Sequence, residues 1–339
     1  MQSDLVIEAS APARVDLAGG TLDLWPLHAL HPGSVTVNLA IDRRATCRVR
    51  RAGAGIRIVA ADRGIDVRAV AARELLADPR TALVGALVEE LSPEGGFEIE
   101  FRSGVPFGSG LGGSSALAVA AAAALSRLSG NSLNGAGGVE FVRDVETRVL
   151  GKPAGVQDYY PAFSGALHCL WFETGRTVAE RREVDPAEWE AHLTLFDTEA
   201  AHSSGMNNWE VFRRRLEGDE AVARSLEKVA AAAREMAAAA RERDFPAMGA
   251  ALRNEWEARR ELAPVVSSPA IDRAVARALE AGAWGGKACG AGGGGCVVFL
   301  SPAEQTASVR AALGSLGEGS VLPVRAEPRG LELSSERAA

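Results

Sequence analysis

The chain has 339 residues, of which 47% are hydrophobic and 24% charged, and its formal net charge is −7. A chain of this length is longer than a single domain of ordinary size, and it fits two domains. The excess of acidic residues gives no reason to expect a nucleic acid or an anionic membrane as a partner. The four cysteines follow no CxxC or zinc spacing, so free thiols in a reducing cytosol are expected. No secretory leader and no uncharged apolar run of ~18 residues are visible, so we expect a cytoplasmic protein.

The first hundred residues are predicted to form mainly strands, because short β-rich runs end there at glycine, proline or charge. The expected strands are Leu5–Ser10, Ser34–Asp42, Thr46–Arg50, Ile56–Ala61 and Phe97–Arg102, with one helix near Thr81–Leu91. A glycine-rich loop, Gly104–Gly113, then leads into the alanine-rich run Ser114–Leu128, which is long enough for about four helical turns. A helix over Val139–Leu150 and a strand over Gly165–Phe172 follow.

The second half begins after a charged stretch, Glu173–Glu190, which we interpret as a domain junction. Apolar residues at helical spacing predict five helices, and three short apolar runs predict strands. The helices are Glu210–Glu217, Asp219–Arg243, Pro246–Leu262, Ile271–Ala281 and Ala303–Leu316, and the strands are Leu193–Asp197, Cys296–Leu300 and Val321–Arg325. The predicted domains are therefore residues 1–182 and 183–330, followed by a frayed tail at 331–339.

The string Gly108-Ser-Gly-Leu-Gly-Gly113 lies between a predicted strand and a predicted helix. Glycines bring backbone N–H groups close to a ligand, and the following helix adds unpaired N–H donors and the positive end of its dipole. These features predict a phosphate site. The hydroxyls of Ser114 and Ser115 are available there to phosphate or magnesium. The structural alternative is a plain turn in which a serine caps the helix.

The same string also matches GxGxxG, so a dinucleotide-binding oxidoreductase is a rival interpretation. That fold needs a strand directly after the helix, with an acid at its end for the ribose. Here the helix runs instead into Asn131–Gly138 and then into another helix. The Walker pattern is missing as well, because no Gly-Lys-Ser/Thr occurs. The oxidoreductase is therefore the less favoured reading.

Two further segments gather polar residues or glycines near strands. Residues 11–23, Ala-Pro-Ala-Arg-Val-Asp-Leu-Ala-Gly-Gly-Thr-Leu-Asp, carry an arginine, two acids and a glycine pair, which predict a polar site. Lys287–Cys296 holds six consecutive glycines or alanines before an apolar strand. Such residues cannot fill a core with side chains, so a close approach of the backbone to something else is predicted.

Taken in order, these three segments resemble the three signature motifs of the GHMP kinases, the galacto-, homoserine, mevalonate and phosphomevalonate kinases. The first motif resembles Pro12–Asp23, the second resembles Pro106–Ala116, and the third resembles Lys287–Gly295. Gly151–Asp158 is similar to the segment that carries the family's catalytic aspartate. The resemblance covers most of the chain. It implies a two-domain α+β fold, with an N-terminal ribosomal-protein-like α/β sandwich and a C-terminal ferredoxin-like α/β domain.

Within that family, Arg14–Gly20 and Gly290–Gly295 look similar to the heptose-phosphate and fucose kinase branch. Galactokinases carry Gly-Glu-His where this chain has Gly19-Gly20-Thr21, a departure that argues against galactose. The resemblance implies transfer of the γ-phosphoryl group of ATP, with Mg²⁺, to the anomeric hydroxyl of a sugar or sugar phosphate.

The resemblance also implies a role for individual residues. Asp158 would take or orient the acceptor proton, Arg14 would stabilise charge on the attacking oxygen, and Ser115 and Glu146 would hold Mg²⁺. The residues expected at the nucleotide are Pro106, Gly108, Ser109, Gly110, Leu111, Gly112, Gly113, Ser114 and Ser115. Those expected at the acceptor are Gly20, Thr21, Asp23, His202, Gly290, Ala291 and Gly292.

Some alternatives stay open at this point. Lys152 is either a contact for a substrate phosphate or an ordinary surface lysine. His202 stands where heptose kinases carry an arginine, which weakens the case for a phosphorylated acceptor. A catalytically silent relative that senses a sugar or nucleotide is the main alternative to an enzyme. The partner expected is a small molecule, with neither nucleic acid nor membrane, and the protein is expected to be a monomer or homodimer.

Overall fold

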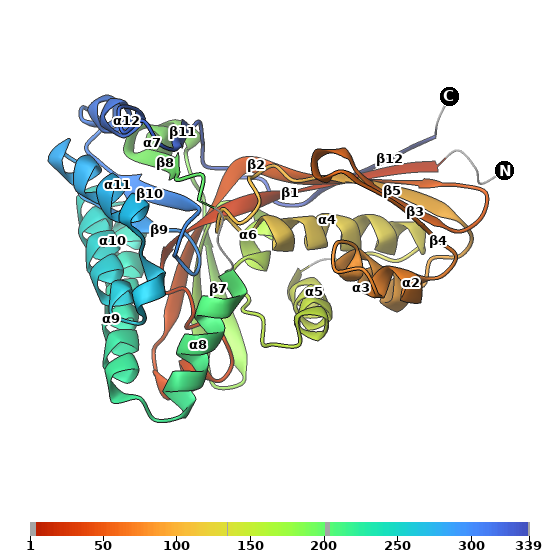
Figure 1. Ribbon diagram of the computed structural model, residues 1–339, viewed down its shortest axis with the longest axis horizontal. Helices are drawn as coiled ribbons and strands as arrows, with labels where there is room; N and C mark the ends of the chain where they lie inside the picture. Colours follow the sequence, from red (N-terminus) through yellow and green to blue (C-terminus); the bar gives the residue numbers. More distant parts are fainter. Residues whose placement is uncertain (1–4, 134, 201–203, 338–339) are drawn as a thin grey trace.

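The computed structural model describes residues 5–133, 135–200 and 204–337, arranged in two lobes (Figure 1). The larger lobe holds an eight-stranded sheet in the order β12-β1-β2-β5-β3-β4, with β6 paired to β2 and β7 paired to β6. The smaller lobe holds the four-stranded sheet β11-β8-β10-β9, whose pairs are all antiparallel. This mixture of sheets and helices is the α+β architecture expected from the sequence.

The strands of the large sheet are β1 (Leu5–Ala18), β2 (Val35–Arg51), β3 (Ile56–Ala60), β4 (Ile65–Ala69), β5 (Phe97–Arg102), β6 (Leu167–Glu173), β7 (Arg176–Arg182) and β12 (Glu332–Arg337). Those of the small sheet are β8 (Leu193–Asp197), β9 (Gly285–Ala288), β10 (Cys296–Leu300) and β11 (Ser320–Leu322). The helices are α1 (Leu27–Leu30), α2 (Ala72–Leu76), α3 (Ala82–Leu91), α4 (Gly113–Leu128), α5 (Gly135–Leu150), α6 (Tyr159–Ser164), α7 (Pro186–His192), α8 (Ser204–Leu216), α9 (Glu220–Glu242), α10 (Phe245–Arg260), α11 (Pro269–Glu280) and α12 (Thr306–Gly314), with 3₁₀ turns at Ala61–Arg63 and Pro264–Val266. No helix in this described part of the chain is long and apolar enough to cross a membrane.

The long strands β1 and β2 run through both lobes and join their cores (Figure 1). Inward residues of the first half of β1 pack with α4, whereas those of its second half pack against the small sheet and α9. The register between β1 and β2 shifts between Pro12 and Ala13, at the change of lobe. Such a bulge bends a strand without ending it. The predicted stop at Ser10 and the predicted division of β2 into two strands are therefore wrong, because the chain bends where the sequence suggests a turn.

Helix α4 is the buried axis of the larger lobe, lying between the large sheet and helices α3 and α5 (Figure 1). Nearly all of its residues from Ser115 to Leu128 are buried, and seven of the 16 residues of α4 are alanine. Small side chains let the sheet and the neighbouring helices approach it on several sides at once. This packing places the first turn of α4, with the glycine-rich loop before it, at the junction of the two lobes.

The small sheet is covered on both faces. Leu195, Val298 and Leu300 face the core shared with β1, β2 and α9, whereas Phe196 and Phe299 face α11 and α12. Continuous apolar runs such as Cys-Val-Val-Phe-Leu in β10 fit this double burial.

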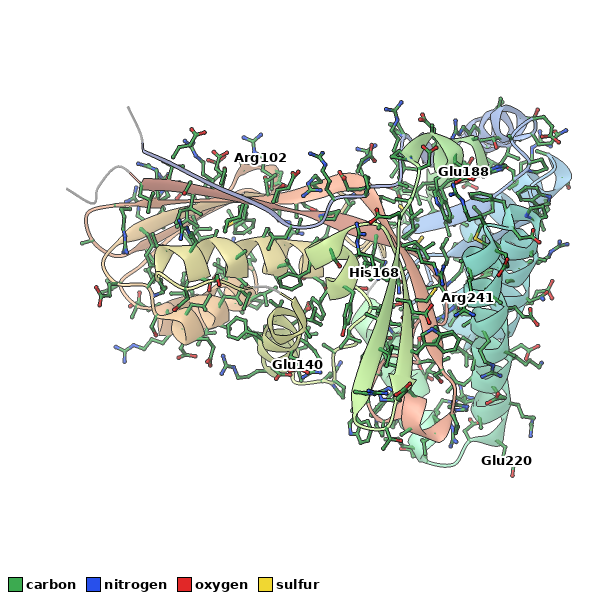
Figure 2. All side chains as sticks on the ribbon, turned by 180° about the vertical axis from the view of Figure 1, so that it is seen from behind. Arg102, Glu140, His168, Glu188, Glu220 and Arg241 are labelled. Atoms are coloured by element: carbon green, nitrogen blue, oxygen red, sulfur yellow. The ribbon has the colours of Figure 1, made fainter. Side chains whose placement is uncertain are left out.

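Two expectations about the second half of the chain need correction. The stretch Glu173–Glu190 is not only a junction, because β7 lies within it and pairs with β6 (Figure 2). Arg241 of α9 forms an ion pair with Glu180 of β7 across this contact. The tail is not frayed over residues 332–337, because β12 pairs antiparallel with β1 from Leu5↔Arg337 to Ser10↔Glu332. The domain limits at 182/183 and 330/331 remain predictions.

Candidate active site

The glycine-rich loop has the backbone shape that an anion site needs. Gly108, Gly110 and Gly112 have φ of +71°, +75° and +70°, a left-handed conformation that residues with a Cβ rarely adopt. Helix α4 begins directly after them, and no side chain in the described part of the chain caps its first turn. The serine-capped turn is therefore wrong, because Ser114 and Ser115 lie inside the helix. The N–H groups of this turn are left to a ligand.

The two glycine-rich segments meet backbone to backbone at this point. A Cβ on Gly110 would lie 2.3 Å from the carbonyl oxygen of Cys289, and one on Gly295 would lie 2.7 Å from that of Gly108. The amide of Cys296 donates to the carbonyl of Ser109 at 2.9 Å. The glycines of both segments thus allow the second lobe to support the loop of the first, as the composition of Lys287–Cys296 predicts.

A cluster of polar side chains lies beside the first turn of α4. Arg14 of β1 donates through Nε to Asp158 Oδ1 at 2.8 Å and through Nη1 to the carbonyl of Gly110 at 2.5 Å. Ser115 Oγ lies 3.3 Å from both Asp158 Oδ2 and Glu146 Oε2. Asp158 immediately precedes α6, and its side chain keeps 23% of its surface exposed, whereas Arg14 is buried. The structure therefore brings together the four residues expected to do the chemistry, with the partly exposed carboxylate of Asp158 among them.

Glu146 of α5 is buried, and its surroundings favour a bound cation. Burial raises the pKa of this carboxyl, and the nearby Asp158 carboxylate raises it further, although hydrogen bonds from Tyr159 and Ser115 work in the opposite direction. The hydroxyl of Ser114 is 3.4 Å from the same carboxylate. Carboxylate and hydroxyl oxygens suit Mg²⁺, which keeps several waters or phosphate oxygens and needs few protein ligands. Among the described residues, no group of three or more histidine, cysteine or acidic side chains forms a metal site.

Asp23 is a second carboxylate at the cleft, and it is held by the segment that leads to Asp158. Its Oδ2 accepts from the amide of Gln157 at 3.1 Å. A Cβ on Gly155 would lie 1.8 Å from the same oxygen, so any side chain there would displace this carboxylate. Burial raises the pKa of Asp23 to about 6, and the charges of Asp158 and Asp16 add to this rise. A ligand that donates hydrogen bonds to this carboxylate would oppose the rise, because such bonds stabilise the charged form.

Behind the cleft wall lies a buried charge network that the sequence did not reveal. Lys287 of β9 forms ion pairs with Asp16 of β1 at 3.0 Å and with Glu255 of α10 at 3.2 Å. Arg259, one turn further along α10, pairs with Glu255 at 2.5 Å and donates to the carbonyl of Gly20 at 2.8 Å. All four charged side chains are at most 2% exposed. Lys287 thus supports the site from the second lobe through these buried partners.

Several residues expected at the acceptor do not line the cleft. Gly20 and Thr21 lie behind its wall, where the Thr21 hydroxyl is shared between Arg259 and Asn208. Gly292 lies against the carbonyl of Val266 and is also outside the lining. Asp23, Gly290 and Ala291 do line it. His202 lies outside the described residues.

The cleft has a volume of about 570 Å³ and contains all the residues expected at the nucleotide, from Pro106 to Ser115. It is also lined by Lys152, for which the sequence left two roles open, and by Arg63, Phe107, Asn208, Trp209 and Phe212. Arg63 lies 5.2 Å above the ring of Phe107. These residues come from four separate parts of the chain, so only the fold could place them together.

The comparisons with known proteins agree with this geometry. Residues 80–166 match the model of the GHMP kinase N-terminal domain, and residues 236–319 match that of the GHMP kinase C-terminal domain. The chain belongs to the GHMP kinase family. The matched regions include the glycine-rich loop, α4, Glu146 and Asp158 in the first case, and the third motif in the second.

Among curated GHMP kinases, the chain is 26% identical over 212 residues to the D-glycero-α-D-manno-heptose 7-phosphate kinase of Campylobacter jejuni. That match covers 60% of this chain and 61% of the relative, less than two thirds of its length. The mevalonate kinase of Archaeoglobus fulgidus is 27% identical over 298 residues, covering 88% of this chain and 93% of the relative. These relatives are kinases of sugars or other alcohols.

Solved structures show the same GHMP kinase fold. A D-glycero-D-manno-heptose 1-phosphate kinase from Bacteroides thetaiotaomicron superimposes with a TM-score of 0.78 at 23% identity, covering 97% of this chain and 98% of the other. Lactococcus lactis galactokinase, in complex with galactose, superimposes with a TM-score of 0.76 at 16% identity over 96% and 95% of the two chains. At such identities the likeness concerns the fold, which confirms the two-domain expectation.

Proposed function

We propose that this GHMP kinase transfers the γ-phosphoryl group of ATP to the anomeric hydroxyl of a sugar or sugar phosphate. The single observation that carries the proposal is the position of Asp158. Its carboxylate is fixed by Arg14 and Ser115 beside the uncapped first turn of α4, and the same segment holds Asp23 on the other side. One carboxylate thus lies next to a phosphate site, and a second carboxylate lies where an acceptor's hydroxyl groups would enter.

In the proposed reaction the acceptor oxygen forms a bond to the γ-phosphorus while the bond from that phosphorus to the bridging β,γ-oxygen breaks, which releases ADP. The proton of the hydroxyl passes to Asp158 and from there to solvent. The transition state of phosphoryl transfer is loose, so little deprotonation is needed before transfer. Orientation of the hydroxyl is then the main task of Asp158, and general-base help is worth roughly 10²–10⁴ in rate.

Arg14 positions two parts of the site at once. Its guanidinium spans from Asp158 to the carbonyl of Gly110 and is buried, so it links the base to the phosphate loop. A fixed distance between attacking and receiving groups is worth much of the rate in such reactions. Ser115 and Glu146 would hold Mg²⁺, which supplies neutralisation of charge on the phosphates. The backbone amides at 108–115 would bind the phosphate oxygens.

Asp23 supports a polyhydroxyl acceptor. A buried carboxylate accepts hydrogen bonds from hydroxyl pairs and is left unpaired by a substrate that lacks them, so it discriminates strongly. The similarity to a heptose 7-phosphate kinase agrees with a sugar. Mevalonate is the second candidate, because mevalonate kinases match 88% of this chain at 27–28% identity.

The test is ADP release from purified protein with ATP and Mg²⁺ against free hexoses, pentoses, uronic acids, heptose 7-phosphate and mevalonate. The proposal expects turnover with a sugar and a product whose phosphorus resonance couples to the anomeric proton. Turnover with mevalonate alone would assign the second candidate. ATP binding without turnover on any acceptor would favour a silent sensor. A cytoplasmic location remains a prediction.

A further inference from the structure

The acceptor end of the cleft holds a lysine with no ionic partner. The sequence has three lysines; Lys228 pairs with Glu261, and Lys287 pairs with Asp16 and Glu255. Lys152 lines the cleft and forms no ion pair with any carboxylate of the described residues. Its side chain is partly buried, so part of its surface is shielded from solvent by the cleft.

The aromatic ring of Trp209 lies next to Lys152 in the cleft. Lys152 Nζ lies 5.9 Å from the centroid of the Trp209 ring. Trp209 in turn stacks on Phe212, with centroids 5.3 Å apart and planes 17° from parallel. Phe212 is 7% exposed and belongs to the core of the smaller lobe, so this stacking holds the Trp209 ring in place. A cation–π contact of this kind is worth only about 0.5–1 kcal/mol at an accessible site, so an anion would displace it readily.

The position of Lys152 relative to the reacting groups defines which part of a ligand it would meet. Five residues separate it from Asp158, and the intervening segment binds Asp23 through the amide of Gln157. Asn208, the neighbour of Trp209, accepts from the Thr21 hydroxyl in the loop that carries Asp23. The segments that carry Lys152 and Trp209 are thus bonded to Asp23 and to its loop, and on this ground we place both side chains at the acceptor end of the cleft.

The other cations of the cleft are already engaged elsewhere. Arg14 is bonded to Asp158 and Gly110. Arg63 lies over Phe107, and the adjacent Asp62 binds the amide of Ser103 at the start of the glycine-rich loop, so this pair belongs to the nucleotide side. Lys152 is thus the cation of the described cleft that faces the acceptor side without a carboxylate partner.

We infer that Lys152 and Trp209 form a subsite for an anionic substituent of the acceptor, a phosphate monoester or a carboxylate remote from the hydroxyl that is phosphorylated. The inference deepens the proposed function and rests on it for the direction of the acceptor. Trp209 offers an apolar face to the C–H side of the ligand, and Lys152 supplies a charge-assisted hydrogen bond to the anion. Asp23 at the other end accepts from hydroxyls, so the subsites impose one orientation.

The experiment compares matched acceptors on wild-type protein, Lys152→Met and the control Lys228→Met, whose lysine lies on α9 away from the cleft lining. The probes are glucose, mannose and galactose, each as the free sugar, the 6-phosphate and the uronic acid, together with mevalonate. Calorimetry without nucleotide gives Kd, and ADP release gives KM and kcat. The 6-phosphate and the uronic acid separate the two sources of negative charge.

At least one anionic probe is expected to bind wild-type protein more tightly than its neutral counterpart. Lys152→Met should raise its Kd and KM about ten- to a hundredfold, with kcat changed less than about threefold and neutral probes unaffected. Lys228→Met should leave all values unchanged. Trp209→Leu should weaken neutral and anionic probes alike.

Two results overturn the inference: no anionic probe binds better than its neutral counterpart, or Lys152→Met weakens both equally. The binding arm separates this failure from that of the proposed function. If an anion binds through Lys152 but no probe is turned over, the subsite is supported and the proposed kinase reaction is contradicted. If only neutral sugars are turned over, the kinase reaction is supported and the subsite is contradicted.

Discussion

The two ends of the cleft are built in different ways. The nucleotide end consists of main chain: three glycines with positive φ, the uncapped start of α4, and a second glycine-rich segment packed against the first. The acceptor end consists of side chains from separate elements, among them Asp23, Lys152 and Trp209. A main-chain site binds the invariant part of a substrate, and it tolerates few substitutions. A side-chain site can change its ligand by single substitutions, so substrate choice in such a fold belongs to the acceptor end.

The largest expected effect comes from the residue between the two ends. Asp158→Asn should lower kcat by about 10²–10⁴ while the ATP Kd stays within about threefold, because the amide cannot accept the hydroxyl proton. Steady-state kinetics and nucleotide titration measure both. Asp144→Asn, an exposed acid paired with Arg143, is the control and should be silent. Unchanged turnover in Asp158→Asn would remove this residue from the mechanism.

A glycine substitution tests the main-chain end. Gly110→Ala should destabilise the protein by about 3 kcal/mol and weaken ATP binding, because φ is +75° and the new Cβ would lie 2.3 Å from the Cys289 carbonyl. Gly137→Ala is the matched control. It lies in α5 with nothing within 4 Å of the new Cβ, so stability should rise by up to about 1 kcal/mol. Equal urea midpoints for both variants would contradict the backbone account.

The proposed Mg²⁺ site at Glu146 can be tested separately from the two ends of the cleft. Glu146→Gln should raise the Mg²⁺ concentration for half-maximal activity at least about tenfold, because a charged oxygen ligand is lost. Glu140→Gln, an exposed position on the same helix α5, should leave the Mg²⁺ requirement unchanged (Figure 2). The same Mg²⁺ dependence in both variants would show that Glu146 is no ligand.

Replacing Asp23, the carboxylate at the acceptor end of the cleft, should have opposite effects on stability and on acceptor binding. The folded pKa of Asp23, about 6, exceeds the unfolded value of about 3.9, so the native state holds this proton more tightly and loses stability as pH rises from about 4 through 6. Asp23→Asn should therefore be more stable than wild type by about 2 kcal/mol at pH 7.5 and nearly equal below pH 4, while the acceptor KM rises about tenfold. Denaturant unfolding at several pH values measures the first effect. A constant stability difference across pH would refute it.

Much of the fold was predictable from local pattern. The predicted and observed bounds of β8 and β10 coincide, because these strands are uninterrupted apolar runs. β9 was missed because Gly285-Gly-Lys-Ala has no strand composition; a Cβ on Gly286 would lie 2.2 Å from the Phe299 ring, so glycine is required by packing. β7 was misread as a junction because edge strands carry charge.

The residues of the site also divide into those that the sequence could predict and those that it could not. The glycine-rich loop, Arg14, Ser115, Glu146 and Asp158 could be named from ordered motifs, and the structure brings them together. Glu255 and Arg259 could not, since a Glu and an Arg four residues apart on a helix usually form a solvated pair. Only the burial of α10 against β9 makes them part of the support for Gly20. Trp209 could likewise not be paired with Lys152 from the sequence, because Lys152 lies more than fifty residues earlier in the chain.

The pairing of β12 with β1 has a consequence for how the protein comes into being. β1 carries Arg14 and Asp16, yet the strand that completes its outer edge lies more than 300 residues later. Nearly all other elements are therefore synthesised before β12 can cover this edge of β1. Until then the backbone amides on this edge of β1 are unpaired and can pair with neighbouring nascent chains. Because Leu5 at the start of β1 pairs with Arg337 at the end of β12, joining these two strands with a short linker and opening the chain at a surface loop should yield a circular permutant that closes this edge early.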